Sequence, residues 1–396
     1  MNYREIATMR KSALNIERVQ CMSSLGNVRD EWNALLQQSE TKTVELTYEW
    51  QTLYWKYFND NSELFVLLVK EAGAIVAIAP LKITRLKSLG MDVRRLELIA
   101  AVESNYQDIV IGKNSEDILV CILDYLFENS SSWDVLYLRN IPEMSTTTEF
   151  LRYQLAGYPS RKVINIEKCM YLEINRASGT PLESFRKKSK NLAYQIRRLE
   201  RELGGVSLQL ASTAEQFRTD MLVFYDLHRG RWNPTETPSM FNDEMYCKFY
   251  LDATLQLNSK NGCELWTLVA GDAQLAQLLG FTFGKYVVVQ LLAYNINYRK
   301  YSPELVLMEL YVNHLLSIDT EIMDFGSYNP YKEQWTNRLK NRVSFQIYPK
   351  RFWPSCLYAL TITRDTFLYS LRKSGFLLNV AKYIRRKVRL LSRNHP

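Results

Sequence analysis

The residues around the start of one expected helix have the types and spacing of an anion-binding site. Ser302 can cap the helix, Pro303 suits its first turn, and Arg299 and Lys300 stand just before them. A helix N-terminus offers unpaired backbone N–H groups and a partial positive charge. The segment is therefore suited to a diphosphate or a carboxylate, and an ordinary capped core helix is the structural alternative.

A second group of polar and aromatic residues interrupts an expected helix in the second half of the chain, at 228–233. The Trp232 indole can stack on a sugar ring, and the Arg231 guanidinium can hold a phosphate. These two residues are therefore candidates for binding a ligand that carries either group. A core tryptophan beside a surface arginine explains the pair equally well.

Basic residues also gather at the start of the segment 183–203, where apolar residues recur at helical spacing. The basic residues are Arg186, Lys187, Lys188 and Lys190, and the apolar face consists of Phe185, Leu192, Ile196, Leu199 and Leu203. Gly204 and Gly205 then end the helix, because glycine adopts positive φ freely. The helix start is either a collar for an anionic substrate or the solvated face of a packing helix.

The elements that must position these residues occur twice in the same order: a hairpin, a strand, a helix and a strand. In the first half they cover 64–70, 74–85, 95–100, 116–128 and 133–138, and in the second half 264–270, 274–283, 286–293, 303–317 and 322–325. The repeat predicts a mixed α/β fold of two tandem lobes, at 1–160 and 161–355, followed by a tail at 356–396.

The positive charge of the chain is concentrated in its tail. Residues 361–396 contain nine basic and one acidic side chain, whereas the 41 basic and 41 acidic side chains of residues 1–360 cancel. Duplex-binding domains usually carry a basic stripe on the folded body, so this balance argues against nucleic acid as a partner. At 376–393, apolar and basic positions predict an amphipathic helix that contacts an anionic membrane peripherally, packs back on the second lobe, or binds RNA.

Composition excludes several classes of site. Glycine is scarce, at 15 of 396 residues, which argues against glycine-rich phosphate loops. Six cysteines without a CxxC pair and three histidines predict free thiols and no metal site. The longest apolar run, 72–81, is too short to span a bilayer, and the N-terminus lacks the apolar core of a signal peptide, so we expect a cytoplasmic protein.

Five segments share their order and residue types with a known family. They are the tryptophan-bearing stretch 32–55, the hairpin ending in Ala79-Pro80-Leu81, the basic helix ending at Gly204-Gly205, the pair Arg231-Trp232, and the block 294–335. In these segments the chain resembles GNAT-superfamily acyltransferases of the type associated with cellulose and exopolysaccharide biosynthesis, which are similar to the FemAB aminoacyl-ligases. The resemblance covers most of 28–350 and implies two GNAT-like (acyl-CoA N-acyltransferase-like) lobes with the working site in the second.

The resemblance also implies roles for individual residues. Lys332, in the matching motif, would stabilise the negative charge that develops on the acyl carbonyl. Asp324 would accept a proton from an amine nucleophile or orient Lys332, and Asp108 would be a second acid exposed to the acceptor. The residues expected to bind the acceptor are Trp232, Arg231 and Tyr331. Without the resemblance, caps of strands and loops and a surface lysine explain these residues.

The expected donor substrate is acyl-CoA, with its diphosphate at Arg299, Lys300 and Ser302. Here the chain departs from the family pattern, because Glu304 stands where the family usually has glycine after Ser-Pro. A carboxylate at this position repels a diphosphate. Aminoacyl-tRNA or another carrier therefore stays open as the donor.

These observations predict an acyltransferase that moves an acyl group to an amine or hydroxyl of a cell-envelope or exopolysaccharide precursor, a small molecule or a carbohydrate. Direct attack is expected, because no Cys/His or Ser/His spacing suggests a covalent intermediate. The alternatives are an aminoacyl-tRNA-dependent FemAB-like ligase and a non-catalytic scaffold of polysaccharide synthesis. Convergence of Lys332 and Asp324 on one open groove would favour an enzyme over a scaffold.

Overall fold

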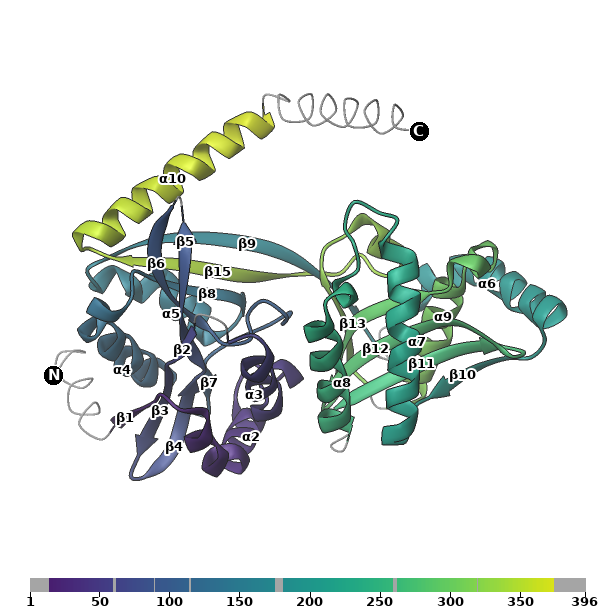
Figure 1. The fold of residues 1–396 in the computed structure, drawn as a ribbon, viewed down its shortest axis with the longest axis horizontal. Coiled ribbons are helices and arrows are strands. Elements are labelled where there is room, and N and C mark those ends of the chain that lie inside the picture. Colours follow the sequence, from purple (N-terminus) through teal and green to yellow (C-terminus); the bar gives the residue numbers. More distant parts are fainter. Residues whose placement is uncertain are drawn as a thin grey trace.

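Two lobes lie side by side in the computed structural model and are joined by a long two-stranded ribbon (Figure 1). The structure describes residues 14–59, 62–88, 90–113, 115–174, 181–258, 262–318 and 320–373. The tail helix predicted at 376–393 and the side chains of the basic cluster at 186–190 lie outside what is described. The mixed α/β architecture of two tandem lobes is confirmed.

The first lobe alternates strands and helices. Its elements are β1 (Leu14–Val19), α2 (Arg29–Gln38), α3 (Tyr48–Tyr57), β2 (Ser62–Leu64), β3 (Val66–Glu71), β4 (Ala74–Ala79), β5 (Leu81–Ser88), β6 (Met91–Leu98), β7 (Val110–Ile111), α4 (Ser115–Glu128), β8 (Val135–Pro142) and α5 (Thr146–Tyr153). The predicted hairpin is present, but its second arm bends at Pro80 and continues as β5 in another sheet.

The second lobe repeats the order of helices and strands. Its elements are α6 (Pro181–Leu203), β10 (Val206–Leu210), α7 (Ala214–Trp232), α8 (Glu244–Asn258), β11 (Cys263–Ala270), β12 (Ala273–Phe283), β13 (Tyr286–Tyr294), α9 (Pro303–Ser317) and β14 (Ile322–Ser327). Helix α6 ends where the sequence predicts, because Gly204 takes a φ of +109°. Pro303 is the first residue of α9, as expected, but Ser302 is left-handed and makes no side-chain cap.

Two long strands connect the lobes. The ribbon consists of β9 (Ser160–Glu173) and β15 (Leu339–Pro349), and α10 (Phe352–Lys373) follows it. Strand β15 lies between β8 of the first lobe and β9, and β9 in turn pairs with β14 of the second lobe. One eleven-stranded sheet, in the order β10-β11-β12-β13-β14-β9-β15-β8-β6-β5-β2, therefore runs through both lobes, beside a four-stranded sheet β1-β3-β4-β7.

An aromatic core also joins the lobes on one face of the sheet. Helix α3 of the first lobe packs on α8 of the second. Trp50 on α3 is fully buried and makes edge-on contacts with Phe249 and Phe281, at ring-centroid distances of 5.2 and 5.0 Å. Because these contacts join residues of both lobes, the lobes are packed as one unit rather than tethered.

Two parallel strands of the second lobe are paired over only part of their length, and the unpaired stretch beyond that pairing is the gap. The ladder between β13 and β14 joins Tyr286–Val288 to Ile322–Asp324 and ends there, although β13 continues to Tyr294. Beyond Asp324, β14 is paired with β9 but no longer with β13, and α9 follows the end of β13. Asp324 therefore stands at the point where the gap begins.

Trp50→Ala should destabilise the whole chain, because it removes a large buried side chain shared by both lobes. Truncation of such a core tryptophan costs about 3–5 kcal/mol in the free energy of unfolding. Urea denaturation followed by circular dichroism measures this cost. Leu222→Ala, at an exposed position on α7, is the control and should change stability by less than about 0.5 kcal/mol. Equal effects of the two substitutions would contradict the shared core.

Candidate active site between the lobes

A pocket with a volume of about 920 Å³ lies between the lobes. The first lobe contributes Thr41, Thr43, Tyr106 and Ser145 to its wall, and the second half of the chain contributes Tyr286 and Lys340. The pocket is large enough for a small-molecule or carbohydrate ligand, because such sites usually measure several hundred Å³.

A buried ion pair stands at the pocket wall. Lys340 Nζ donates to Asp324 Oδ2 at 2.6 Å and to the Tyr286 hydroxyl at 2.7 Å. Asp324 is fully buried, whereas the Lys340 side chain is 31% exposed and lines the pocket. Three aromatic rings surround the ammonium, with their centroids 4.5 Å (Tyr106), 4.8 Å (Tyr286) and 5.5 Å (Tyr171) away. An ammonium carries three N–H donors, so one remains for a ligand in the pocket.

Asp324 is saturated with donors. Its Oδ2 also accepts from the Tyr286 hydroxyl, and its Oδ1 accepts from the backbone N–H of Gly326 at 2.6 Å. Burial and the neighbouring Asp324 carboxylate raise the pKa of Tyr286 well above its usual value, so this hydroxyl stays protonated. These donors compensate the cost of burying the charge of Asp324. The carboxylate in turn holds Lys340 and Tyr286 in place.

Lys332 lies elsewhere along the same segment. Its Nζ donates to the carbonyls of Phe325 and Ser327, at 2.6 and 2.8 Å, and so braces the end of β14. Burial lowers the pKa of Lys332. The structure thus pairs Asp324 with Lys340 rather than with Lys332. Lys340 was not predicted from the sequence, because it follows no motif and its strand was not anticipated.

Two buried carboxyl groups lie behind the first-lobe wall of the pocket. Glu45 accepts from the backbone N–H groups of Asn105 and Tyr106, at 2.6 and 3.1 Å, and burial raises its pKa to about 7. Asp108 accepts from the Thr41 hydroxyl at 2.7 Å, and burial raises its pKa to about 6. Asp108 is only 3% exposed, so the expectation of an acid presented directly to the acceptor is corrected: Thr41 lines the pocket in front of it.

Several of the other predicted residues meet at the start of α9. Arg231 Nη1 lies 3.4 Å from Glu304 Oε2, and its guanidinium lies over the rings of Tyr294 and Trp232, 4.8 and 5.0 Å from their centroids. The Tyr331 hydroxyl also bonds Glu304. Arg231 and Glu304, which the sequence did not link to each other, therefore form one ion pair beside the N-terminus of α9.

Arg299 and Lys300, the other cations predicted for the donor site, do not join the pair of Arg231 and Glu304. Lys300 turns toward α6, with its Nζ 3.7 Å from Glu202 Oε2 and 4.7 Å from the Tyr301 ring. Arg299 is exposed in the 3₁₀ helix Ile296–Tyr301. Both cations remain near the start of α9, but neither lies against Arg231 in the contacts that the structure gives.

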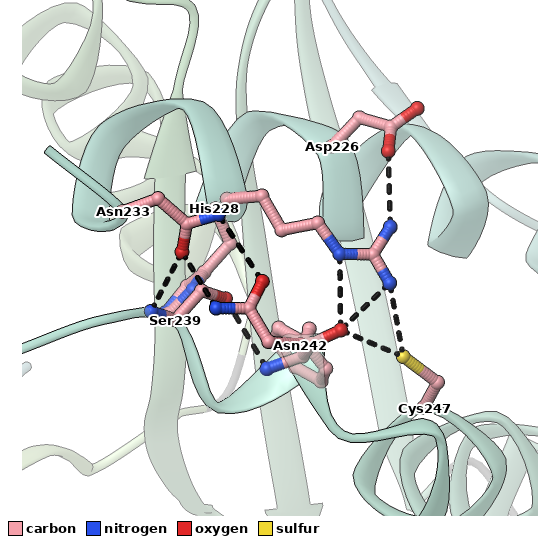
Figure 2. A network of polar contacts seen from close by, with 8 residues as sticks. Asp226, His228, Asn233, Ser239, Asn242 and Cys247 are labelled. Atoms are coloured by element: carbon pink, nitrogen blue, oxygen red, sulfur yellow. Dashed lines mark hydrogen bonds and ion pairs between the residues drawn. The ribbon is translucent and has the colours of Figure 1, made fainter.

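A polar network fixes the turn that follows α7 (Figure 2). Arg231 and Trp232 are the last two residues of α7 before this turn. Arg229 donates to the Phe241 carbonyl at 2.6 and 3.0 Å, and His228 Nδ1 lies 2.7 Å from the Ser239 hydroxyl. Burial lowers the pKa of His228 to about 4, so the ring is neutral near pH 7 and serves as a structural partner.

No group of three metal-ligating side chains occurs within the described ranges. All six cysteines are free thiols. Among the helices that the structure describes, none is long and apolar enough to cross a membrane.

Comparison with known proteins finds a family match within the second lobe. Residues 186–333 match the family described as Acetyltransferase (GNAT) domain. This match confirms the acyltransferase class that the sequence predicts. No protein of curated function matches the sequence.

Solved structures share the fold over most of the chain. FemX is 11% identical, with a TM-score of 0.61 over 87% of this chain and 99% of FemX. The C-terminal domain of a putative lysylphosphatidylglycerol synthetase from Agrobacterium fabrum is 11% identical, with a TM-score of 0.50 over 85% of this chain and 96% of that domain. A conserved protein of unknown function from Bacteroides thetaiotaomicron is 8% identical, with a TM-score of 0.53 over 84% of this chain and all of that one. At these identities the likeness establishes the fold.

The raised pKa of Glu45 predicts a pH-dependent stability. Because its folded pKa of about 7 exceeds the ordinary value of 4.5, its contribution is fully present below pH 4.5 and is lost as the pH rises through 7. The stability of the wild type relative to Glu45→Gln should therefore fall by on the order of 3 kcal/mol between pH 4.5 and 7.5. Chemical denaturation at several pH values measures this difference. A constant difference would show that Glu45 titrates normally.

Proposed function

We propose that the chain transfers an acyl group from acyl-CoA to an amine or hydroxyl of a cell-envelope precursor, at the wall of the pocket between the lobes. The GNAT domain at 186–333 supports the reaction class. The likeness to FemX and to a synthetase named for a phospholipid supports an envelope acceptor. An exopolysaccharide precursor, small molecule or carbohydrate, is the finer proposal and rests on the sequence resemblance.

One observation carries this proposal: the Asp324–Tyr286–Lys340 cluster stands where the ladder between β13 and β14 ends, and its Tyr286 and Lys340 line the pocket. A donor lying in the gap and an acceptor lying in the pocket would meet at this cluster. Binding both substrates in one geometry supplies much of the rate of a direct transfer. A scaffold has no need for a charged cluster at this junction.

The chemistry proposed is direct attack on the thioester. The acceptor nitrogen or oxygen forms a bond to the acyl carbon, the C–S bond breaks, and the proton of the nucleophile passes to the leaving thiolate through pocket water. The free N–H of Lys340 stabilises the carbonyl oxygen as it becomes negative, because a fixed cation in a water-poor site is more effective than a solvated one. Asp324 and Tyr286 hold that cation in place.

The donor site is proposed at the start of α9, where Arg231 and the helix N-terminus offer positive charge. Glu304 already pairs with Arg231 there, and burial raises the pKa of Glu304. A diphosphate must therefore displace this carboxylate or compete with it. The same pair favours a second candidate function, an aminoacyl-tRNA-dependent ligase, whose donor need not place a diphosphate at this point.

A peripheral position at the inner face of the membrane is proposed for a cytoplasmic protein. Helix α10 leaves the body beside β5 and β6 (Figure 1) and exposes Phe352 and Phe367, 86% and 61% accessible. The sequence that follows α10, 374–396, contains six basic residues and no acidic one. An apolar and basic segment of this kind binds anionic lipid surfaces, where lipid-linked envelope precursors would be met.

The reaction is tested by incubating the purified chain with labelled acyl-CoAs of several lengths and with amine- and hydroxyl-bearing envelope precursors. Transfer of label to a precursor, with release of free CoA in equal amount, supports the proposal. Transfer from aminoacyl-tRNA but from no acyl-CoA would favour the second candidate. Absence of transfer from either donor would contradict an enzymatic role with these acceptors.

Lys340→Met should lower kcat far more than Lys332→Met. Loss of one oxyanion donor costs about 2.7–4 kcal/mol in the barrier, a rate loss of about 10²–10³. Lys332 braces the end of β14 and should have a smaller effect. Steady-state kinetics with saturating donor measures both, and Lys340→Arg, which keeps the charge beside Asp324, is the folding control. The reverse order of effects would assign the oxyanion role to Lys332.

Glu304→Gln should tighten the binding of CoA to the chain. It removes the carboxylate beside Arg231 while keeping nearly the same side-chain shape. Removal of one repulsive charge at a half-buried site should lower Kd by about 3–10-fold, measured by calorimetry at low salt. Glu321→Gln, a substitution on the pocket rim, is the matched control. Weaker binding by Glu304→Gln would indicate that the diphosphate lies elsewhere.

The chain should bind anionic liposomes through its tail. Each basic residue near such a surface contributes about 1 kcal/mol. The full chain should therefore float with vesicles of anionic lipid at low salt, whereas a chain ending at Lys373 should stay in the soluble fraction. A chain of full length with the six basic residues changed to Gln is the control. If the full chain also stays soluble, the membrane proposal is wrong.

A further inference from the structure

A turn of the first lobe reaches into the gap between β13 and β14. The Asn105 side chain donates from Nδ2 to Gln290 Oε1 on β13 at 3.0 Å. On β14, a Cβ added to Gly326 would lie 2.4 Å from Asn105 Oδ1. The ladder of these strands ends at Val288 and Asp324, so Asn105 lies across the first residues of the gap.

Gly326 is required for this approach on two grounds. Its φ of +68° lies in the left-handed region, which residues with a Cβ adopt at a cost. Its missing side chain also leaves the space that Asn105 occupies. The close approach of Asn105 to β14 therefore depends on the glycine at position 326 as well as on the turn.

The turn is fixed at its backbone by both halves of the chain. The N–H of Asn105 donates to the buried Glu45 at 2.6 Å, and its carbonyl accepts from Arg342 Nη1, on β15, at 2.8 Å. The Ser104 hydroxyl accepts from Trp50 Nε1 at 3.1 Å. A loop without regular structure is thus held by a buried carboxylate, a buried guanidinium and a core indole, which fixes Asn105 in position.

The same turn serves the catalytic cluster. Tyr106, the next residue, places its ring 4.5 Å from Lys340 Nζ. Consecutive residues of the first lobe therefore reach the gap and the cation at the pocket wall. The first lobe closes its own corresponding strand pair, β6 and β8, because Asn140 Nδ2 on β8 bonds the carbonyls of Ala101 and Ser104, at 3.0 and 2.9 Å.

We infer that Asn105 is a specificity-determining residue of the second lobe's active site, and that its side chain limits the length of the acyl group that the gap accepts. This inference rests on the proposed function, which places the acyl donor in the gap. A short acyl group would end before it reached the amide, whereas a longer chain would meet it. The first lobe thus acts in the reaction as the part that sets the acyl size.

The test is the chain-length dependence of binding by non-hydrolysable ethyl-, butyl- and octyl-CoA thioethers, measured by calorimetry on the full chain. The wild type should bind ethyl-CoA more tightly than octyl-CoA. Asn105→Ala should lower the ratio of the octyl to the ethyl Kd by about tenfold or more, because each methylene that becomes buried strengthens binding. Asn105→Gln, with a longer side chain, should raise the ratio.

Val102→Ala is the matched control, because Val102 lies in the same loop and is 53% exposed. It should leave the ratio unchanged, and Asn105→Ser replaces Asn105→Ala if the alanine variant does not fold. A ratio that is the same in the wild type and all Asn105 variants would overturn the inference while leaving the proposed function intact. Absence of binding by every variant and the wild type would contradict the donor of the proposed function, and the inference with it.

Discussion

Insertion of β15 between β8 and β9 is the constraint on which the arrangement of the site depends. This strand comes from the end of the second half of the chain, yet it completes the sheet of the first lobe. Its first residues lie where the two lobes meet. Lys340 reaches Asp324 on β14, and two residues later Arg342 reaches the Asn105 carbonyl. Without the ladder, neither cation would stand at the junction.

The ladder also explains why the lobes are packed as one body. Separating them would break the backbone hydrogen bonds of β15 with β8, of β15 with β9 or of β9 with β14, along with the aromatic contacts of Trp50. Hydrogen bonds of a buried ladder are costly to leave unmade. The pocket between the lobes is therefore a fixed site, with walls that each lobe supplies.

The buried carboxyl groups Asp324 and Glu45 at this junction differ in whether a cation pairs with them. Asp324 has a cation and two further donors, which compensate the cost of burying its charge. Glu45 accepts from two backbone N–H groups and the Thr43 hydroxyl, and no cation among the described residues pairs with it; burial raises its pKa to about 7. A charge that must stay ionised is paired, whereas one that only holds a turn can be protonated near neutral pH.

The local sequence pattern predicts much of the fold, but it does not predict the central strands β9 and β15. The hairpins, the helix 303–317 and the strand at 322 are predicted closely, because alternation and turn residues are local signals. Strand β9 was not predicted, because six of its first nine residues are exposed, Ile164 and Ile166 among them, so its alternating apolar residues do not mark a buried face. Strand β15 alternates, but its position between β8 and β9 is a long-range pairing that no local pattern encodes.

Some residues of the candidate site carry a signal in the sequence, and others do not. Arg231 and Trp232 were singled out by residue type, and Asp324 and Tyr331 by the family resemblance. In the structure Asp324 lies within β14, whereas Arg231, Trp232 and Tyr331 lie near the start of α9. Lys340 and Asn105 carry no such signal, because each becomes significant only through partners far away in the sequence. Tertiary pairing decides such roles, and residue type alone does not.

The placement of the acyl group between β13 and β14 is tested most directly by photolabelling the full chain with an acyl-CoA that carries a diazirine at the end of a short acyl chain. Peptides are then mapped by mass spectrometry, with and without an excess of unlabelled acyl-CoA. The account predicts competed labelling of the segments around Asn105, Gln290 and Gly326, which surround the gap. Competed labelling around β6 and β8 of the first lobe, with none on these segments, would contradict it.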